Sequence, residues 1–273
     1  ALLVRSDNLE LFRALLPHLT PDELNEAGQS TPLGYAVFRR SPGFVDALLD
    51  AGAGVDQAGT LEMAPLHYAA EGFWPEMVEL LLRRGADPDV GWPKTPLVAV
   101  LKMLPPPAGN VSSSLLDVAA ECIEMLLDAG ANPDAPGVLA LAIKRGGARI
   151  VGVLLARGAD PSPHGPAPHA LHDAVSKDPD PAVVAALVVG GARSTLFTAD
   201  ADPNDIYVLG PLNELAQTYA HGGAFLRGPC SAQDNPDGHL DALAAVWASL
   251  VAAGDDPHDQ MCSQHAPGVL FKE

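Results

Sequence analysis

The sequence has little of what several large classes of protein need. Only 3 of its 273 residues are cysteine, too few and too scattered for a disulfide framework. Aromatic residues make up 5% of the chain, so a core has to be built mainly from Ala, Leu and Val. No apolar stretch approaches the roughly 20 residues that a membrane-spanning helix needs, and the first residues lack a signal-peptide pattern. These absences favour a reducing compartment, so we expect a cytoplasmic protein that binds no membrane.

Positive charge is also scarce. Lys and Arg total 16 against 34 for Asp and Glu, which gives a formal net charge of −18. A chain this acidic repels polyanions, so we do not expect nucleic acid as a partner. The apolar fraction of 48% is ordinary for a folded protein, which argues against a disordered chain.

Internal repetition is what the sequence has in abundance. A Leu-Leu-x-x-Gly-Ala motif places glycines at positions 52, 85, 130 and 158, and weaker copies place them at 191 and 254. A Thr-Pro-Leu or related motif precedes each copy, and it is clearest at Thr31, Ala64 and Thr95. Glycines 52 and 85 are 33 residues apart, as are 158 and 191, whereas the other intervals are 45, 28 and 63. Two motifs that recur in the same order indicate about six copies of one structural unit.

Each motif predicts a piece of local structure. Proline suits the first turn of a helix, where no backbone N–H is needed, and the threonine before it can cap that helix. The Leu of this motif and the Ala three or four residues after it make a narrow apolar stripe. The Leu-Leu pair closes a second apolar helix, and the glycine after it suits a left-handed C-cap. Each copy is therefore predicted to form a helix, a tight turn, a second helix and a loop.

This pattern resembles the ankyrin-repeat family. The resemblance is carried by Ala64-Pro65-Leu66-His67-Tyr68-Ala69-Ala70, by Gly85-Ala86-Asp87 and by the 33-residue period. It implies an all-α ankyrin-repeat solenoid of stacked helix-turn-helix units with short finger hairpins, in which His67 and His172 are structural. We expect a degenerate N-terminal capping unit over 1–30, the repeat array over 31–256 with insertions near 104–115 and 221–239, and a C-terminal tail over 257–273.

The resemblance also implies a function. Ankyrin stacks present the ends of their first helices and their fingers on one concave side, so we expect a protein-interaction scaffold and no enzyme. Five of the ten residues at these helix ends are basic, which makes a basic stripe in an acidic protein. Such a stripe favours an acidic or phosphorylated protein segment as the partner. Basic residues also suit the last turn of any helix, however, because they offset the helix dipole.

The residues expected to bind the partner are Phe38, Arg39, Trp92, Lys102, Lys144, Arg145 and Lys177. Trp92 is included because a tryptophan in a short finger has no core to enter, and such residues often anchor interfaces. We also expect Arg149 to lie beside Lys144 and Arg145, and Met63 to be exposed in its finger. The protein is expected to be a monomer without a cofactor.

Two alternatives stay open. His258, Cys262 and His265 have a spacing that suits zinc ligands, so the tail would form a small metal-binding or enzymatic region. Asp200, Asp202 and Asp205 form an acidic finger, with which an inhibitor or immunity-type protein would block a basic site on its partner. If the protein is a bacterial effector, it would act in the cytosol of a host cell.

Overall fold

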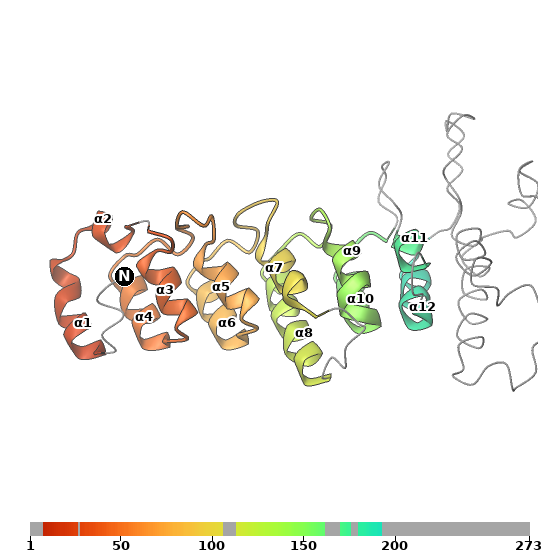
Figure 1. The fold of residues 1–273 in the computed structure, drawn as a ribbon, viewed down its shortest axis with the longest axis horizontal. Helices are drawn as coiled ribbons and strands as arrows, with labels where there is room; N and C mark the ends of the chain where they lie inside the picture. The colour runs from red at the N-terminus through yellow and green to blue at the C-terminus, as the bar shows by residue number, and fades with distance from the viewer. Residues whose placement is uncertain (1–7, 27, 106–112, 162–169, 176–179, 193–273) are drawn as a thin grey trace, which may run out of the picture. The chain divides into compact units, whose positions relative to one another are not determined.

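A computed structural model describes residues 8–26, 28–105, 113–161, 170–175 and 180–192. The chain divides into two compact parts, residues 1–149 and 150–273, and each is described by itself. In the ranges described, the regular elements are all helices (Figure 1). The predicted fingers contain turns there and no β-strand.

Short helices connected by turns and loops make up the N-terminal part. It opens with α1 (Leu9–Leu15), the 3-10 turn η2 (Leu16–His18) and α2 (Pro21–Leu24). Three helix pairs follow, namely α3 (Pro32–Phe38) with α4 (Pro42–Asp50), α5 (Pro65–Glu71) with α6 (Pro75–Arg83), and α7 (Pro96–Met103) with α8 (Ser113–Asp128). Next come α9 (Val138–Leu141), a π-helical turn η3 (Ala142–Gly146) and α10 (Gly147–Ala156), which continues into the C-terminal part.

The C-terminal part contains α11 (Ala170–Val175) and α12 (Pro181–Val189), which contact each other. Its buried side chains include Leu154, Val184 and Leu187. The insertion predicted at 221–239 and the tail predicted at 257–273 lie outside the described residues.

The helix ends follow the sequence signals. The Thr31 and Thr95 hydroxyls each accept the backbone N–H of the third residue after them, at 3.1 and 3.4 Å. At the other end of each pair, the glycine of the Leu-Leu-x-x-Gly motif has φ between +88° and +99°, which favours glycine. The next amide then donates back into the helix, as Ala53 does to the Leu48 carbonyl at 3.0 Å. These are local signals, and each copy carries its own set.

The core lies between successive helix pairs. In the N-terminal part, α3, α5 and α7 contact one another in series, and α6 contacts α8. First helices therefore form one row and second helices another, with the finger loops together at the upper edge of Figure 1. Leu33, Leu66 and Leu97 of the first row are at most 1% exposed, as are Leu48 and Leu81 of the second. Burying one such side chain contributes about 1.5–3 kcal/mol, and neighbouring pairs share that burial.

Hydrogen bonds join successive loops at one repeated position. The residue two places after the closing glycine donates its backbone N–H to a side-chain oxygen of the preceding loop. These bonds run from Gly54 to Asn25 (2.7 Å), from Asp87 to Asp56 (3.1 Å) and from Asn132 to Asp89 (3.0 Å). Since the same bond recurs at three junctions, it fixes how each loop is placed on the one before it.

His67 connects its own helix to the following finger. Its Nδ1 accepts the backbone N–H of Ala64 at 3.2 Å, and its Nε2 lies 2.6 Å from the Lys94 carbonyl. A carbonyl can only accept, so Nε2 carries the proton. The side chain is buried, in keeping with the structural role that the resemblance implies for it. The side chain of His172 lies outside the described residues.

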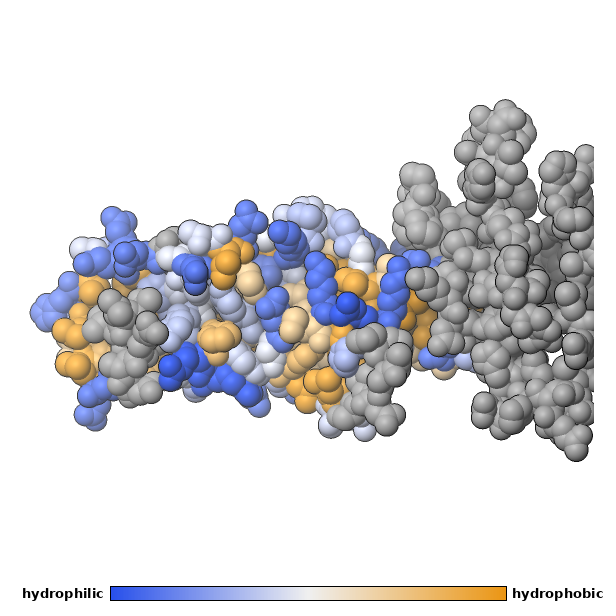
Figure 2. All heavy atoms as spheres, viewed as in Figure 1, coloured by the Kyte–Doolittle hydropathy of each residue, from blue (hydrophilic) through white to orange (hydrophobic). Residues whose placement is uncertain are grey.

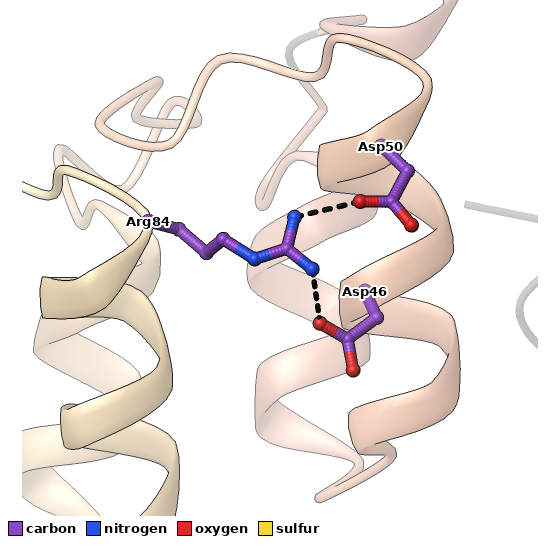
Figure 3. A network of polar contacts seen from close by, with 3 residues as sticks. All are labelled: Asp46, Asp50 and Arg84. Carbon is purple, nitrogen blue, oxygen red and sulfur yellow. Dashed lines mark hydrogen bonds and ion pairs between the residues drawn. The ribbon is translucent and has the colours of Figure 1, made fainter.

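An arginine connects two second helices. Arg84 reaches from the end of α6 to α4, where it donates to Asp46 at 2.6 Å and to Asp50 at 2.7 Å (Figure 3). The two aspartates are four residues apart, so they lie on the same face of α4. At the next junction, the residue directly before the closing glycine is Ala129, whereas here it is Arg84. A shallow hollow of about 330 Å³ lies there, lined by Glu79, Leu82, Arg83, Met125, Asp128 and Ala129.

Replacing this arginine tests whether the connection stabilises the array. Arg84→Ala should lower the urea midpoint, because both contacts to α4 are lost. The neighbouring Arg83 is the matched control: its ion pair with Glu79 is longer, at 3.7 Å, and lies within one helix. Arg83→Ala should change the midpoint little, and the loss from Arg84→Ala should shrink in about 1 M salt. Equal midpoints for the two variants at low salt would show that the connection stabilises nothing.

The third copy departs from the first two. Its second helix, α8, has 16 residues, whereas α4 and α6 have 9 each. Residues Ser113, Ser114 and Leu115, which the predicted insertion includes, form the first turn of α8. Before the fourth copy, residues 132–137 form consecutive turns in place of a finger. Helix α1, which belongs to the predicted N-terminal cap, packs on α4 of the first pair. The rings of Phe12 and Phe44 are 4.9 Å apart.

Candidate protein-binding surface

The C-terminal ends of the first helices occupy equivalent positions, and we call them the helix-end row. The row consists of Phe38, Arg39, Glu71, Lys102, Met103, Lys144 and Arg145. Contacts connect its members to neighbouring helices. The ring of Phe38 meets that of Tyr68 edge to face with centroids 6.3 Å apart, and the Arg145 guanidinium donates to the Lys102 carbonyl. The row therefore follows the stacking of α3, α5, α7 and η3.

Apolar and cationic side chains share this row. Phe38 is 60% exposed and Met103 is 50% exposed, so both large apolar side chains are open to solvent. Arg39, Lys102 and Lys144 are also exposed. A partner segment that lies along the row would meet both kinds of contact.

Two basic residues of the predicted stripe point to other groups. Arg145 is only partly exposed, and its guanidinium also donates to the Leu104 carbonyl at 2.9 Å, at the end of α7. It therefore satisfies carbonyls that the helix leaves unpaired. Arg149 forms an ion pair with Asp117 of α8. Lys177 lies outside the described residues.

Two finger tips expose further apolar side chains, Leu61 at 56% and Trp92 at 55%. Trp92 lies in a tight turn closed by the Lys94 N–H, which donates to the Gly91 carbonyl at 2.9 Å, and its bond to Pro93 is cis. His67 supports this turn from below, since a Cβ at Gly91 would come within 2.9 Å of its ring. The indole is therefore presented by a well-supported loop.

Met63 does not lie where the sequence analysis placed it. It is half-buried, and Leu61, two residues earlier, is the exposed large apolar residue of this finger. Met63 directly precedes Ala64, the N-cap of α5. A hydrophobic residue at that place often packs against the fourth residue of the helix, and this signal identifies Met63 as the inward-facing residue.

A single acid interrupts the row. Burial raises the pKa of the Glu71 carboxyl, and the nearby His67 and Lys102 partly oppose that shift. A raised pKa means that the folded state binds the proton more readily than the unfolded state does. The Glu71 charge therefore lowers stability at neutral pH, and this cost disappears as the pH falls through the raised pKa.

Removing this charge should stabilise the protein. Glu71→Gln is expected to raise the urea midpoint at neutral pH, because the partly buried carboxylate is replaced by a neutral amide. The gain should vanish near pH 4, around the ordinary pKa of a glutamate, where the carboxyl of the original protein is protonated too. Glu76→Gln, at an exposed position of α6, serves as the control and should show neither effect. A lower midpoint for Glu71→Gln at neutral pH would contradict this account of the row.

The cysteine in the described ranges is shielded from solvent. Cys122 is buried in α8, and burial raises the pKa of its thiol to about 12, with the charges of Glu121 and Glu76 adding to the effect. The thiolate, which is the reactive form, is therefore scarce at neutral pH. Across these ranges no group of three His, Cys, Asp or Glu residues could hold a metal ion. None of their helices combines the length and apolar character that a bilayer crossing needs.

The residues of the two alternative hypotheses are not among those described. His258, Cys262 and His265 belong to the predicted tail, and Asp200, Asp202 and Asp205 belong to the predicted acidic finger. All six lie outside the described ranges.

On the face drawn in Figure 2, hydrophobic surface occurs in more than one place. Figure 2 shows hydrophobic atoms over α1 and again near the lower end of α8, separated by hydrophilic surface. On α1 the exposed large apolar side chain is Leu11, at 50%. Separate apolar side chains set among polar ones suit a partner that is recognised at spaced positions.

Comparison with known proteins identifies the repeats. A family model for ankyrin repeats matches residues 1–91 in three copies, which includes the region predicted as a cap. The ankyrin repeat domain of human ASB11 aligns with a TM-score of 0.56 at 19% identity, over 84% of this chain and 97% of that one. An ankyrin repeat domain from Acinetobacter baumannii AYE aligns with a TM-score of 0.49 at 23% identity, over 57% and 79%. No curated protein matches.

Residues 1–91 therefore carry ankyrin repeats, and the chain has the fold of ankyrin repeat domains. The family model carries this assignment over residues 1–91, and the likeness to the human domain shows the same fold over most of the chain. The predicted family and all-α fold are confirmed. Ankyrin repeats are generally protein–protein interaction modules, and they are typically scaffolds without enzymatic activity.

Proposed function

We propose that this protein recognises an acidic segment of a partner protein along the helix-end row and the finger tips. Four exposed apolar side chains carry the proposal: Phe38, Leu61, Trp92 and Met103. They stand at the two kinds of position that an ankyrin stack presents on its concave side. Exposed cations accompany them in the same row, namely Arg39, Lys102 and Lys144.

The apolar side chains would supply the affinity. Covering one of them contributes about 1.5–3 kcal/mol at most, and aromatic anchors commonly dominate binding energy. Trp92 is supported by its turn and by His67, and Phe38 rests against Tyr68. Because the indole is already placed, little of its conformational entropy is lost when the partner binds.

The cations would supply the selectivity. A net charge of −18 repels acidic molecules at long range, so only a segment that fits the row gains from Lys102 and Lys144 at short range. Glu71 weakens this attraction at neutral pH, and its raised pKa limits that effect as the pH falls. The monomeric state and the cytoplasmic location stay predictions.

Selection from a peptide library tests this function. A library of short peptides rich in Asp, Glu and apolar residues is selected against the full chain, and the best peptide is measured by calorimetry. Lys102→Glu combined with Lys144→Glu should weaken binding by at least about tenfold, because two attractive contacts become repulsive. The matched control is Arg13→Glu with Arg83→Glu, which changes the net charge equally at exposed positions away from the row.

Two results would contradict the proposal. One is a library that yields no acidic binder. The other is an equal loss of affinity in the two double variants, which would mean that net charge alone matters. Melting curves of both variants test whether a loss of affinity is caused by unfolding.

A further inference from the structure

The ring of Tyr68 fills a space beside Gly34, near the start of α3. Counted from the start of each motif, Gly34 in the first repeat stands where His67 stands in the second. A Cβ at Gly34 would lie 3.1 Å from Cε2 of Tyr68 and 2.6 Å from Oγ of Ser30. The Tyr68 ring therefore lies over Gly34, where α3 meets its finger.

The hydroxyl of Tyr68 is buried but unpaired. Its ring is partly exposed and contacts Phe38, yet the hydroxyl oxygen is shielded from solvent and has no hydrogen-bond partner among the described residues. A buried polar group without a partner destabilises the folded state. Phenylalanine would have the same shape without that cost, so packing alone does not account for a tyrosine here.

The aromatic ring that contacts Tyr68 belongs to Phe38 of the helix-end row. Phe38 closes α3 and is 60% exposed, so its ring can turn without opening the core. Its contact with Tyr68 is edge to face, which leaves much of the ring surface uncovered. A partner side chain that takes the place of Phe38 would reach Tyr68, and Arg39 beside it adds a positive charge.

We propose that Tyr68 is a specificity-determining residue whose hydroxyl donates a hydrogen bond to a carboxylate of the bound partner segment. The inference rests on the proposed function. It adds the group that binds the acidic side chain of the partner at the first two repeats. A hydroxyl that donates to a carboxylate makes a charge-assisted bond, roughly twice as strong as a neutral one. Binding then satisfies a group that the unbound array leaves unpaired.

Tyr68→Phe tests the proposal with the acidic peptide selected above and the full chain. We expect this variant to bind about tenfold more weakly and to melt at the same or a higher temperature, because the unpaired hydroxyl is gone. Tyr35 holds the same position in the first repeat, 33 residues earlier, so Tyr35→Phe is the matched control and should keep its affinity. The loss should disappear for peptides in which the recognised Asp or Glu is replaced by Asn or Gln.

Each other outcome counts against the inference. One such outcome is that Tyr68→Phe keeps the affinity of the unchanged protein while Lys102→Glu combined with Lys144→Glu loses it. In that case the hydroxyl does not bind the carboxylate, and the proposed function stands. If Tyr68→Phe melts clearly lower, the hydroxyl has a structural role instead. If neither variant alters affinity, or no acidic peptide binds, the inference fails together with the function on which it rests.

Discussion

Burial of apolar surface between neighbouring helix pairs is the interaction on which the rest of this array depends. Leu33, Leu66 and Leu97 are inaccessible because α3, α5 and α7 cover one another in series. Burial has no direction of its own, so the polar contacts decide how each pair is placed on the last. The repeated loop hydrogen bonds, the His67 bridge and the Arg84 connection have that role. Since the buried faces hold the stack together, residues at helix ends and finger tips are left to contact a partner.

Local signals made most of the fold predictable. A capping threonine, a proline in the first helical turn and a closing glycine act within a few residues. The motifs therefore place the starts of α3, α5 and α7 and the glycines that follow α4, α6, α8 and α10. The third copy shows where this stops. Prolines 105–107 exclude helix only near themselves, and the Ser-Ser-Leu-Leu run that follows is helical as the first turn of α8. Weak local preference gives way there to packing, which a single sequence does not reveal.

The candidate surface depends more on contacts between distant residues. Phe38, Trp92 and Lys102 lie at the surface because of their place in the repeat, which the sequence gives directly. Arg145 is different, because the carbonyls that hold it belong to residues 43 and 41 positions earlier. The Tyr68 ring lies over Gly34 of another repeat, and its hydroxyl has no partner among the described residues. Such pairings follow from how repeats stack, so composition and spacing do not predict them.

Stability of fragments that end at repeat boundaries tests the stacking claim most directly. Fragments 1–62, 1–94 and 1–137 would be unfolded in urea. If neighbouring pairs bury each other's apolar faces, the midpoint and the slope of unfolding both rise with each added pair, and fragment 1–62 shows no cooperative transition. A fragment 1–62 that unfolds cooperatively at the midpoint of fragment 1–137 would mean that each pair is stable by itself, and the claim would be wrong.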